Sequence, residues 1–148
     1  MNAMMDGSER VLVKYPLFTA AVKRIQECFD SYGTTAEPAC CPIVGESGCG
    51  KTTIIAYFAS LHPRVDHKHG VEQPVLLAKV PARPTVKSLA ETLLYKLGDP
   101  LWARGNTVSK SIRLRELLKR CQVRLLALAR SPSENCFLKS AQRPRAEL

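Results

Sequence analysis

The sequence contains no long hydrophobic run. No stretch approaches the roughly 18 consecutive apolar residues that a membrane span needs, and the first ten residues lack the apolar segment of a secretory signal peptide. The six cysteines include no C-x-x-C pair and no spacing typical of a disulfide framework. Reduced thiols are typical of the cytoplasm. We therefore expect a cytoplasmic protein with no membrane contact.

Acidic residues are scarce relative to basic ones. Thirteen Asp and Glu stand against 22 Lys and Arg, which gives a formal net charge of +9. Such an excess favours an anionic partner such as a nucleic acid, although a solvated basic surface would give the same count. Hydrophobic residues make up 45% of the 148 residues. The chain is therefore long and apolar enough to bury the core of one domain.

Hydrophobic periodicity predicts helices alternating with strands. Four segments have the apolar spacing of amphipathic helices: residues 15–32, 51–62, 85–97 and 108–121. Apolar runs at 40–44 and 75–80 predict buried strands. Residues 123–129 fit either a third strand or a continuation of the preceding helix, because no Gly or Pro separates the two.

This order of elements predicts an α/β fold with a parallel sheet flanked by helices. Residues 63–73 are expected to form a polar loop. The segment from Ser131 onward shows no periodicity and is expected to be disordered. We therefore divide the chain into a domain of residues 1–130 and a tail of residues 131–148.

Residues 45–52, Gly-Glu-Ser-Gly-Cys-Gly-Lys-Thr, match the phosphate-loop pattern G-x-x-x-x-G-K-[ST] without a mismatch. Glycines let the backbone turn its N–H groups towards phosphate oxygens, and the following helix directs its positive dipole end at the same site. The motif lies between an apolar run and an amphipathic helix, which distinguishes it from a chance match in a glycine-rich turn. It predicts binding of a nucleoside triphosphate, and we expect ATP.

The predicted nucleotide contacts are the loop and the residue after it: Gly45, Glu46, Ser47, Gly48, Cys49, Gly50, Lys51, Thr52 and Thr53. Lys51 is expected to reach the β- and γ-phosphates, and the hydroxyl of Thr52 to bind Mg²⁺. No N-K-x-D sequence of the guanine-recognition type occurs, which disfavours a GTPase. No substrate-binding or lid segment of a small-molecule kinase can be identified.

Two weaker clusters have simpler interpretations than a functional site. One loop contains His62, Asp66, His67 and His69. Their spacing fits no familiar zinc pattern, so we interpret them as part of a hydrated surface loop. The adjacent Cys40 and Cys41 could be redox-active, but on a buried strand they are expected to be small apolar residues.

Basic residues gather late in the chain, at Lys110, Arg113, Arg115, Lys119, Arg120 and Arg124. These side chains could contact DNA phosphates. They would equally form the solvated face of a helix. The sequence leaves both interpretations open.

Three stretches resemble the TniB group of bacterial transposition proteins, AAA+-type ATPases related to TnsC. They are KYPLFTAAVKRIQECF (14–29), CCPIVGESGCGKTTIIAYFASLHPRV (40–65) and PVLLAKVPARPTVKSLAETLLYKLGDP (74–100). The K-Y-P-x-F and V-P-A-R-P-T segments are the specific part of a resemblance that runs from about residue 11 to about residue 128.

The resemblance implies a three-layer P-loop NTPase core with ATP and Mg²⁺ as ligands. In this family an ATP-bound protein assembles on target DNA and directs a partner transposase with a DDE catalytic core. The resemblance also implies that residues 11–16 lie near the adenine. The expected partners are therefore a DDE-type transposase, target DNA and further copies of the chain.

The chain departs from the family at the end of the third strand. The family has an Asp there that supports Mg²⁺ and a Glu that polarises the attacking water, whereas this chain has Ala129 and Arg130. No Asp or Glu occurs between Glu116 and Glu134. The family's later sensor residues and arginine finger are also missing. The comparison implies a truncated domain that binds ATP with little or no hydrolysis.

Three functions therefore remain open. The chain is an ATP-binding regulator of transposition, a nucleotide-binding remnant that is non-functional or acts only through interactions, or a small P-loop NTPase of another class. The missing acidic pair favours the second for this chain, and the resemblance favours the first.

Overall fold

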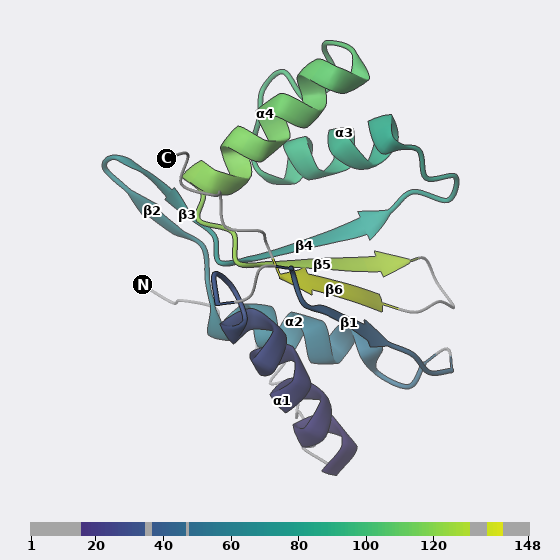
Figure 1. Ribbon diagram of the computed structural model, residues 1–148. Helices are drawn as coiled ribbons and strands as arrows, with labels where there is room; N and C mark the ends of the chain where they lie inside the picture. The colour runs from purple at the N-terminus through teal and green to yellow at the C-terminus, as the bar shows by residue number, and fades with distance from the viewer. Residues whose placement is uncertain (1–15, 35–36, 47, 131–135, 141–148) are drawn as a thin grey trace, which may run out of the picture.

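The computed structural model describes residues 16–34, 37–46, 48–130 and 136–140 (Figure 1). Residues 11–15, which the resemblance places near an adenine, and Ser47 of the phosphate loop lie outside these ranges. The elements in chain order are α1 (Pro16–Asp30), β1 (Cys40–Ile43), α2 (Lys51–Leu61), β2 (Val65–His67), β3 (Gly70–Glu72), β4 (Val75–Val80), α3 (Val86–Lys96), α4 (Thr107–Arg120), β5 (Leu125–Arg130) and β6 (Cys136–Ser140). The predicted α/β class is confirmed.

The main sheet has four strands in the order β1-β6-β5-β4. Strands β4 and β5 are parallel, whereas β6 is antiparallel to both β5 and β1. The predicted parallel sheet is therefore confirmed only for the pair β4 and β5, and the sheet as a whole is mixed. Since β6 runs against both neighbours, β1, β4 and β5 share one direction, and their carboxyl ends lie at the same edge of the sheet (Figure 1).

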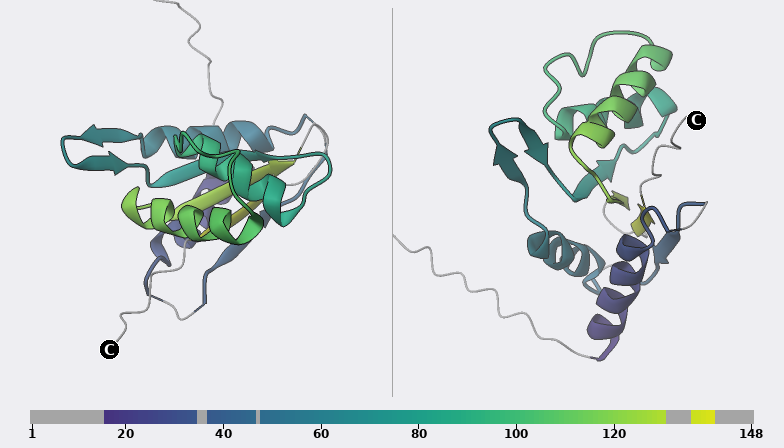
Figure 2. Two further views of the ribbon diagram at one scale, coloured as in Figure 1. Left: turned by 90° about the horizontal axis from the view of Figure 1, so that it is seen from above. Right: turned by 60° about the vertical axis from the view of Figure 1, so that its left-hand side comes forward.

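Helices cover both faces of this sheet, giving three layers. Helices α1 and α2 lie on one face and α3 and α4 on the other (Figures 1 and 2). On the first face Phe18, Phe29 and Phe58 pack with the buried residues Leu125 and Ala127 of β5. Leu126 and Leu128, the alternate residues of β5, pack on the other face of the sheet in a second apolar cluster beneath α3 and α4. Because both faces are covered, β5 is almost continuously apolar.

Strand β6 lies within the segment that was expected to be disordered. That expectation is wrong for residues 136–140, which pair with β1 on one side and β5 on the other. Leu138 stands opposite Cys41 of β1 and Ala127 of β5, and its side chain is fully buried. Within the described residues β1 has no other strand partner. The strand that carries the phosphate loop is therefore joined to the sheet through β6.

Strand β1 is an edge strand, not the buried strand expected from its composition. Cys40 and Pro42 are exposed, and Cys41 is half-buried. A central strand forms hydrogen bonds with a neighbour on each side, and proline has no N–H to donate. The position of Pro42 in an edge strand is therefore typical. The interpretation of the two cysteines as buried apolar residues is therefore wrong for Cys40. Cys40, Cys41 and Cys121 are free thiols.

Residues 65–72 form a hairpin in place of the expected loop. Strands β2 and β3 are antiparallel, with Val65 opposite Glu72 and His67 opposite Gly70. Strand β2 is exposed and β3 is only partly buried, so the hairpin has no apolar alternation by which the sequence could reveal it. His67 Nε2 lies 3.3 Å from Glu72 Oε2. In the described ranges no group of three His, Cys, Asp or Glu could hold a metal ion.

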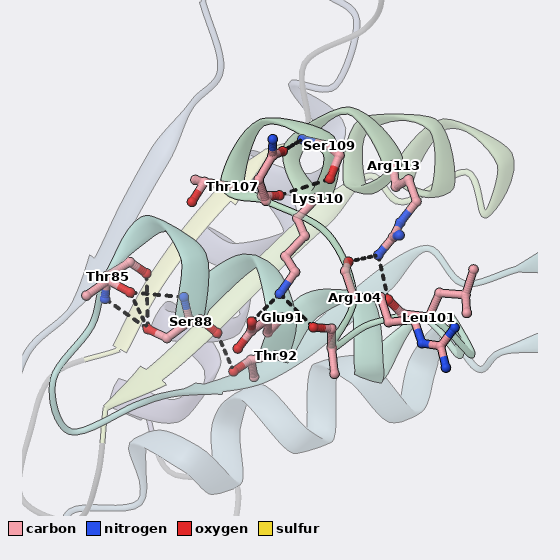
Figure 3. A network of polar contacts seen from close by, with 12 residues as sticks. Thr85, Ser88, Glu91, Thr92, Leu101, Arg104, Thr107, Ser109, Lys110 and Arg113 are labelled. Carbon is pink, nitrogen blue, oxygen red and sulfur yellow. Dashed lines mark hydrogen bonds and ion pairs between the residues drawn. The ribbon is translucent and has the colours of Figure 1, made fainter.

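Local signals at the ends of α3 and α4 explain the second helical layer (Figure 3). Thr85 caps α3 as predicted, accepting a hydrogen bond from Ser88 N–H at 3.0 Å. After α4, Gln122 adopts a left-handed backbone with φ of 52°, which ends the helix. Residues 125–130 are therefore a strand, and not a continuation of the helix.

None of the described helices is both long and apolar enough to cross a membrane.

Candidate nucleotide-binding site

The phosphate-loop motif forms the connection between β1 and α2, as predicted. Gly48 and Gly50 have φ values of 82° and 86°, a left-handed conformation that favours glycine. Gly50 precedes α2, and no described side chain caps the helix. The first intrahelical bond runs from Ile54 N–H to Gly50 O at 3.0 Å. The N–H groups before it lie at the positive end of the helix dipole, where an anion is stabilised.

Tight packing within the loop explains the first glycine. A Cβ atom on Gly45 would lie 2.8 Å from Cys49 Sγ, closer than two such atoms can approach. Cys49 N–H donates to Glu46 O at 3.3 Å and closes the turn. A larger residue at position 45 would require the Cys49 side chain to move.

Lys51 lies inside the loop and not in solvent. Its side chain is 7% exposed, and Nζ donates to Gly45 O at 2.5 Å and to Glu46 O at 2.6 Å. Nζ also lies 3.6 Å from Cys49 Sγ. The ammonium group is thus held by neutral carbonyl oxygens in the concavity of the loop. A phosphate oxygen, which carries more negative charge, would make a stronger hydrogen bond to it.

The remaining predicted contacts surround this lysine. Thr52 and Thr53 are exposed in the first turn of α2, so both hydroxyls are accessible. The side chain of Glu46 is exposed as well. The backbone cradle and Lys51 fit the phosphates of a nucleotide, and Thr52 offers one oxygen ligand for Mg²⁺.

The carboxyl end of β5 lies two strands away from the phosphate loop. In the register of the sheet Ile43 stands opposite Cys136, and Cys136 stands opposite Ala129. Adjacent strands are about 4.8 Å apart, so the Cα atoms of Ile43 and Ala129 are separated by roughly 10 Å. Ala129 is buried and Arg130, the last residue of β5, is exposed. The sheet therefore presents an arginine at the edge where an α/β protein binds its ligand.

The basic residues of α4 and β5 do not form one surface. Lys110 is fully buried, and its Nζ donates to the carboxylate of Glu91 and, at 3.1 Å, to Ala103 O (Figure 3). It cannot contact DNA from this position, so its predicted role on the surface is wrong. The burial of Lys110 could not be predicted from the sequence, because a lysine is rarely fully buried.

Arg113 and Arg124 are also held by other parts of the protein. Arg113 Nε lies 3.2 Å from Asp99 Oδ2, and the guanidinium of Arg124 lies 4.3 Å from the ring centre of Phe29. The other three predicted DNA contacts are exposed on α4: Arg115, Lys119 and Arg120. Any phosphate contact on this helix must rest mainly on them.

The pair of Lys110 and Glu91 makes stability depend on pH. The hydrogen bond from Lys110 lowers the pKa of Glu91, and the charge of Lys87 lowers it further. A lowered folded-state pKa stabilises the protein above the unfolded-state pKa of about 4.3, and that contribution is lost as the pH falls through the folded pKa. Glu91→Gln is therefore expected to lower the melting temperature at pH 7, and this deficit should shrink as the pH falls below about 4.3.

Thermal unfolding of both proteins across this range measures the difference. Glu116→Gln is the matched control, because Glu116 is exposed and lies 3.8 Å from Lys119. It should change the melting temperature little at either pH. If the melting temperature of Glu91→Gln were lowered by the same amount at pH 3 as at pH 7, the pair of Lys110 and Glu91 would not cause the pH dependence of stability.

A hollow of about 550 Å³ adjoins the phosphate loop and was not predicted. It lies between α1 and β1 and reaches Val44, the residue before the loop. Burial raises the pKa of the Cys41 thiol on its wall, and the nearby Arg24 partly offsets this. The sequence could not reveal this hollow, because it depends on β1 being an edge strand.

The comparison with protein families matches most of the chain. The sequence model of the family described as "Bacterial TniB protein" matches residues 6–129. This range includes the phosphate loop and ends one residue before Arg130, so β6 lies outside it. No curated protein matches the sequence.

Proposed function

This chain belongs to the TniB family, and we propose that it is an ATP-binding regulatory protein of DNA transposition. Membership of the family associates the chain with transposition. ATP is the proposed ligand of residues 45–53, with Mg²⁺ on the hydroxyl of Thr52. The proposed partners are a DDE-type transposase, target DNA and further copies of the chain, in the bacterial cytoplasm.

The position of Lys51 is the observation that supports this proposal most. Its ammonium group is enclosed by the carbonyl oxygens of Gly45 and Glu46 at the amino end of α2. Burying a charged lysine is costly unless it has strong partners. A fold that places this charge beside uncapped helix N–H groups provides two independent attractions for the same anion.

Removing the Lys51 ammonium is expected to weaken nucleotide binding. A hydrogen bond to a charged group contributes about 1.5–3 kcal/mol, so Lys51→Ala should raise the Kd for a fluorescent ATP analogue by roughly tenfold to hundredfold. Lys68→Ala is the control, since it removes the same charge from the exposed hairpin. Thermal unfolding verifies that both variants fold. Equal affinity of Lys51→Ala and wild type would contradict the proposal.

Binding to DNA is expected to be weak, independent of sequence and sensitive to salt. With about three phosphate contacts from the exposed side chains of α4, counterion release predicts a slope of log K against log salt of about −2.7. Arg120→Ala should make the slope shallower by about 0.9. Fluorescence anisotropy of a labelled duplex at several salt concentrations measures it.

The Lys68→Ala variant serves as the control for this experiment too and should keep the wild-type slope. A flat salt dependence, or no binding at low salt, would remove DNA from the proposed partners.

One observation also favours a nucleotide-binding protein that acts only through interactions. β5 ends in Ala129 and Arg130, and neither side chain can hold a metal or activate water. Under this alternative ATP stabilises a conformation that a partner recognises, and no turnover is required.

A further inference from the structure

Two aromatic side chains are exposed to solvent where α3 leads into the loop before α4. Tyr95 of α3 is 62% exposed, and Trp102 of the loop is 38% exposed. Their ring centres lie 5.5 Å apart with the ring planes at 76°, so the edge of one ring meets a face of the other. Of the phenylalanine, tyrosine and tryptophan side chains that the structure describes, no others are exposed. Large rings gain free energy by leaving water, so an adjacent exposed pair indicates a surface that a partner can cover.

Two cations of α4 hold this loop in one conformation (Figure 3). Arg113 Nη2 donates to the carbonyl oxygens of Leu101 and Arg104, at 2.7 Å and 3.2 Å. Lys110 Nζ donates to the carbonyl oxygen of Ala103 at 3.1 Å. Three consecutive turns of the loop backbone are thus fixed from within the protein. The exposed rings are held in place before a partner arrives, which reduces the entropy lost on binding.

The accessible charges beside the rings are positive. Lys96 and Arg104 are exposed, and each lies within two residues of one of the rings. The carboxylates of the same region, Glu91 and Asp99, are paired with the two cations of α4 that hold the loop. The surface therefore combines aromatic rings with positive charge, which favours an anionic partner.

We propose that Tyr95 and Trp102 form a stacking platform for a single-stranded nucleic acid. Unpaired bases stack on exposed aromatic rings while cations hold the phosphates, and such binding tolerates any sequence. An acidic protein segment would match the charge, but paired flat rings match the faces of bases. The platform lies on the α3 and α4 side of the sheet and does not depend on the proposed nucleotide site.

The fluorescence of the protein reports on this surface alone, because Trp102 is the only tryptophan of the chain. Titration with an oligothymidylate of about 15 nucleotides at low salt is expected to quench it, since a base stacks on the indole ring. An abasic oligomer of the same length has the charge without the rings and should quench little. A duplex of the same length should also quench little, because its bases stack on one another. Oligouridylate distinguishes RNA from DNA as the source of the strand.

Removing a ring is expected to weaken the binding of the single strand. Tyr95→Ala should raise the Kd from the quenching titration by roughly fivefold or more, the effect of losing one stacked base. Ile112→Ala is the matched control, because Ile112 is exposed on α4 but has no ring. Trp102→Ala, followed by the anisotropy of a labelled oligonucleotide, should lose a similar factor, whereas Trp102→Phe should retain most of the affinity. Arg104→Ala should make the slope of log K against log salt shallower by about 0.7.

The melting temperatures of these variants verify that they fold, as substitutions of exposed residues usually do. Absence of quenching at low salt, or an equal Kd for Tyr95→Ala and wild type, would overturn the platform. Quenching by poly-glutamate as strong as that by oligothymidylate would assign the surface to an acidic protein segment instead. Lys51→Ala, which should lose the ATP analogue, is expected to bind the single strand as wild type does. Failure of the platform is therefore distinguishable from failure of the nucleotide site.

Discussion

Replacing Leu138 by alanine is expected to lower the free energy of unfolding by roughly 2–5 kcal/mol, the usual range for removing a fully buried leucine. Leu138 is 0% exposed and belongs to the core beneath α1 and α2. It is also the central residue of β6, between Cys41 and Ala127. The cavity would therefore open where β1 is joined to the rest of the sheet.

Lys139→Ala is the matched control, because Lys139 neighbours Leu138 on β6 but is exposed. A surface substitution of this kind usually changes stability by less than about 0.5 kcal/mol. Urea unfolding followed by circular dichroism measures both variants. If Leu138→Ala were no less stable than Lys139→Ala, β6 would not be part of the core in solution, and β1 would need another partner.

The helices could be predicted from the sequence because their signals are local. Phe18, Ile25 and Phe29 recur at helical spacing, and the three of them are buried in α1. Thr85 has the hydroxyl of a helix cap, three residues before its partner Ser88. The phosphate loop was equally visible, since its glycines and lysine act within eight residues of chain. Periodicity, capping and the loop motif depend on neighbours in sequence, so no tertiary information was needed.

The strands were harder to predict because pairing depends on residues far apart in the chain. β6 has five residues and pairs with both β1 and β5, and β1 lies far from it in the chain. The burial of Lys110 likewise depends on Glu91, 19 residues away, and on Ala103 O. Helix α4 ends before Gln122, which has a left-handed backbone that glutamine seldom adopts, so the sequence did not predict that residues 125–130 form a strand. Neither the pairing of β6 nor the burial of Lys110 has a local signal.

The purified protein is expected to hydrolyse ATP no faster than its Lys51→Ala variant. Phosphoryl transfer requires a cradle for the phosphates and a group that orients the attacking water. The proposed cradle is residues 45–52. The second has no counterpart at the end of β5, where Ala129 is buried and Arg130 cannot accept a proton. A positioned base typically accelerates the reaction by about 10²–10⁴-fold.

Phosphate release measured at saturating ATP, on samples that bind the fluorescent analogue, tests this expectation. Turnover that Lys51→Ala abolishes would contradict it and would require an acid elsewhere in the chain. Asp99 is paired with Arg113 and Glu116 is exposed on α4, whereas Glu46 belongs to the phosphate loop itself. Glu46→Gln would then distinguish a base within the loop from one outside it, because only the former loses turnover while analogue binding remains.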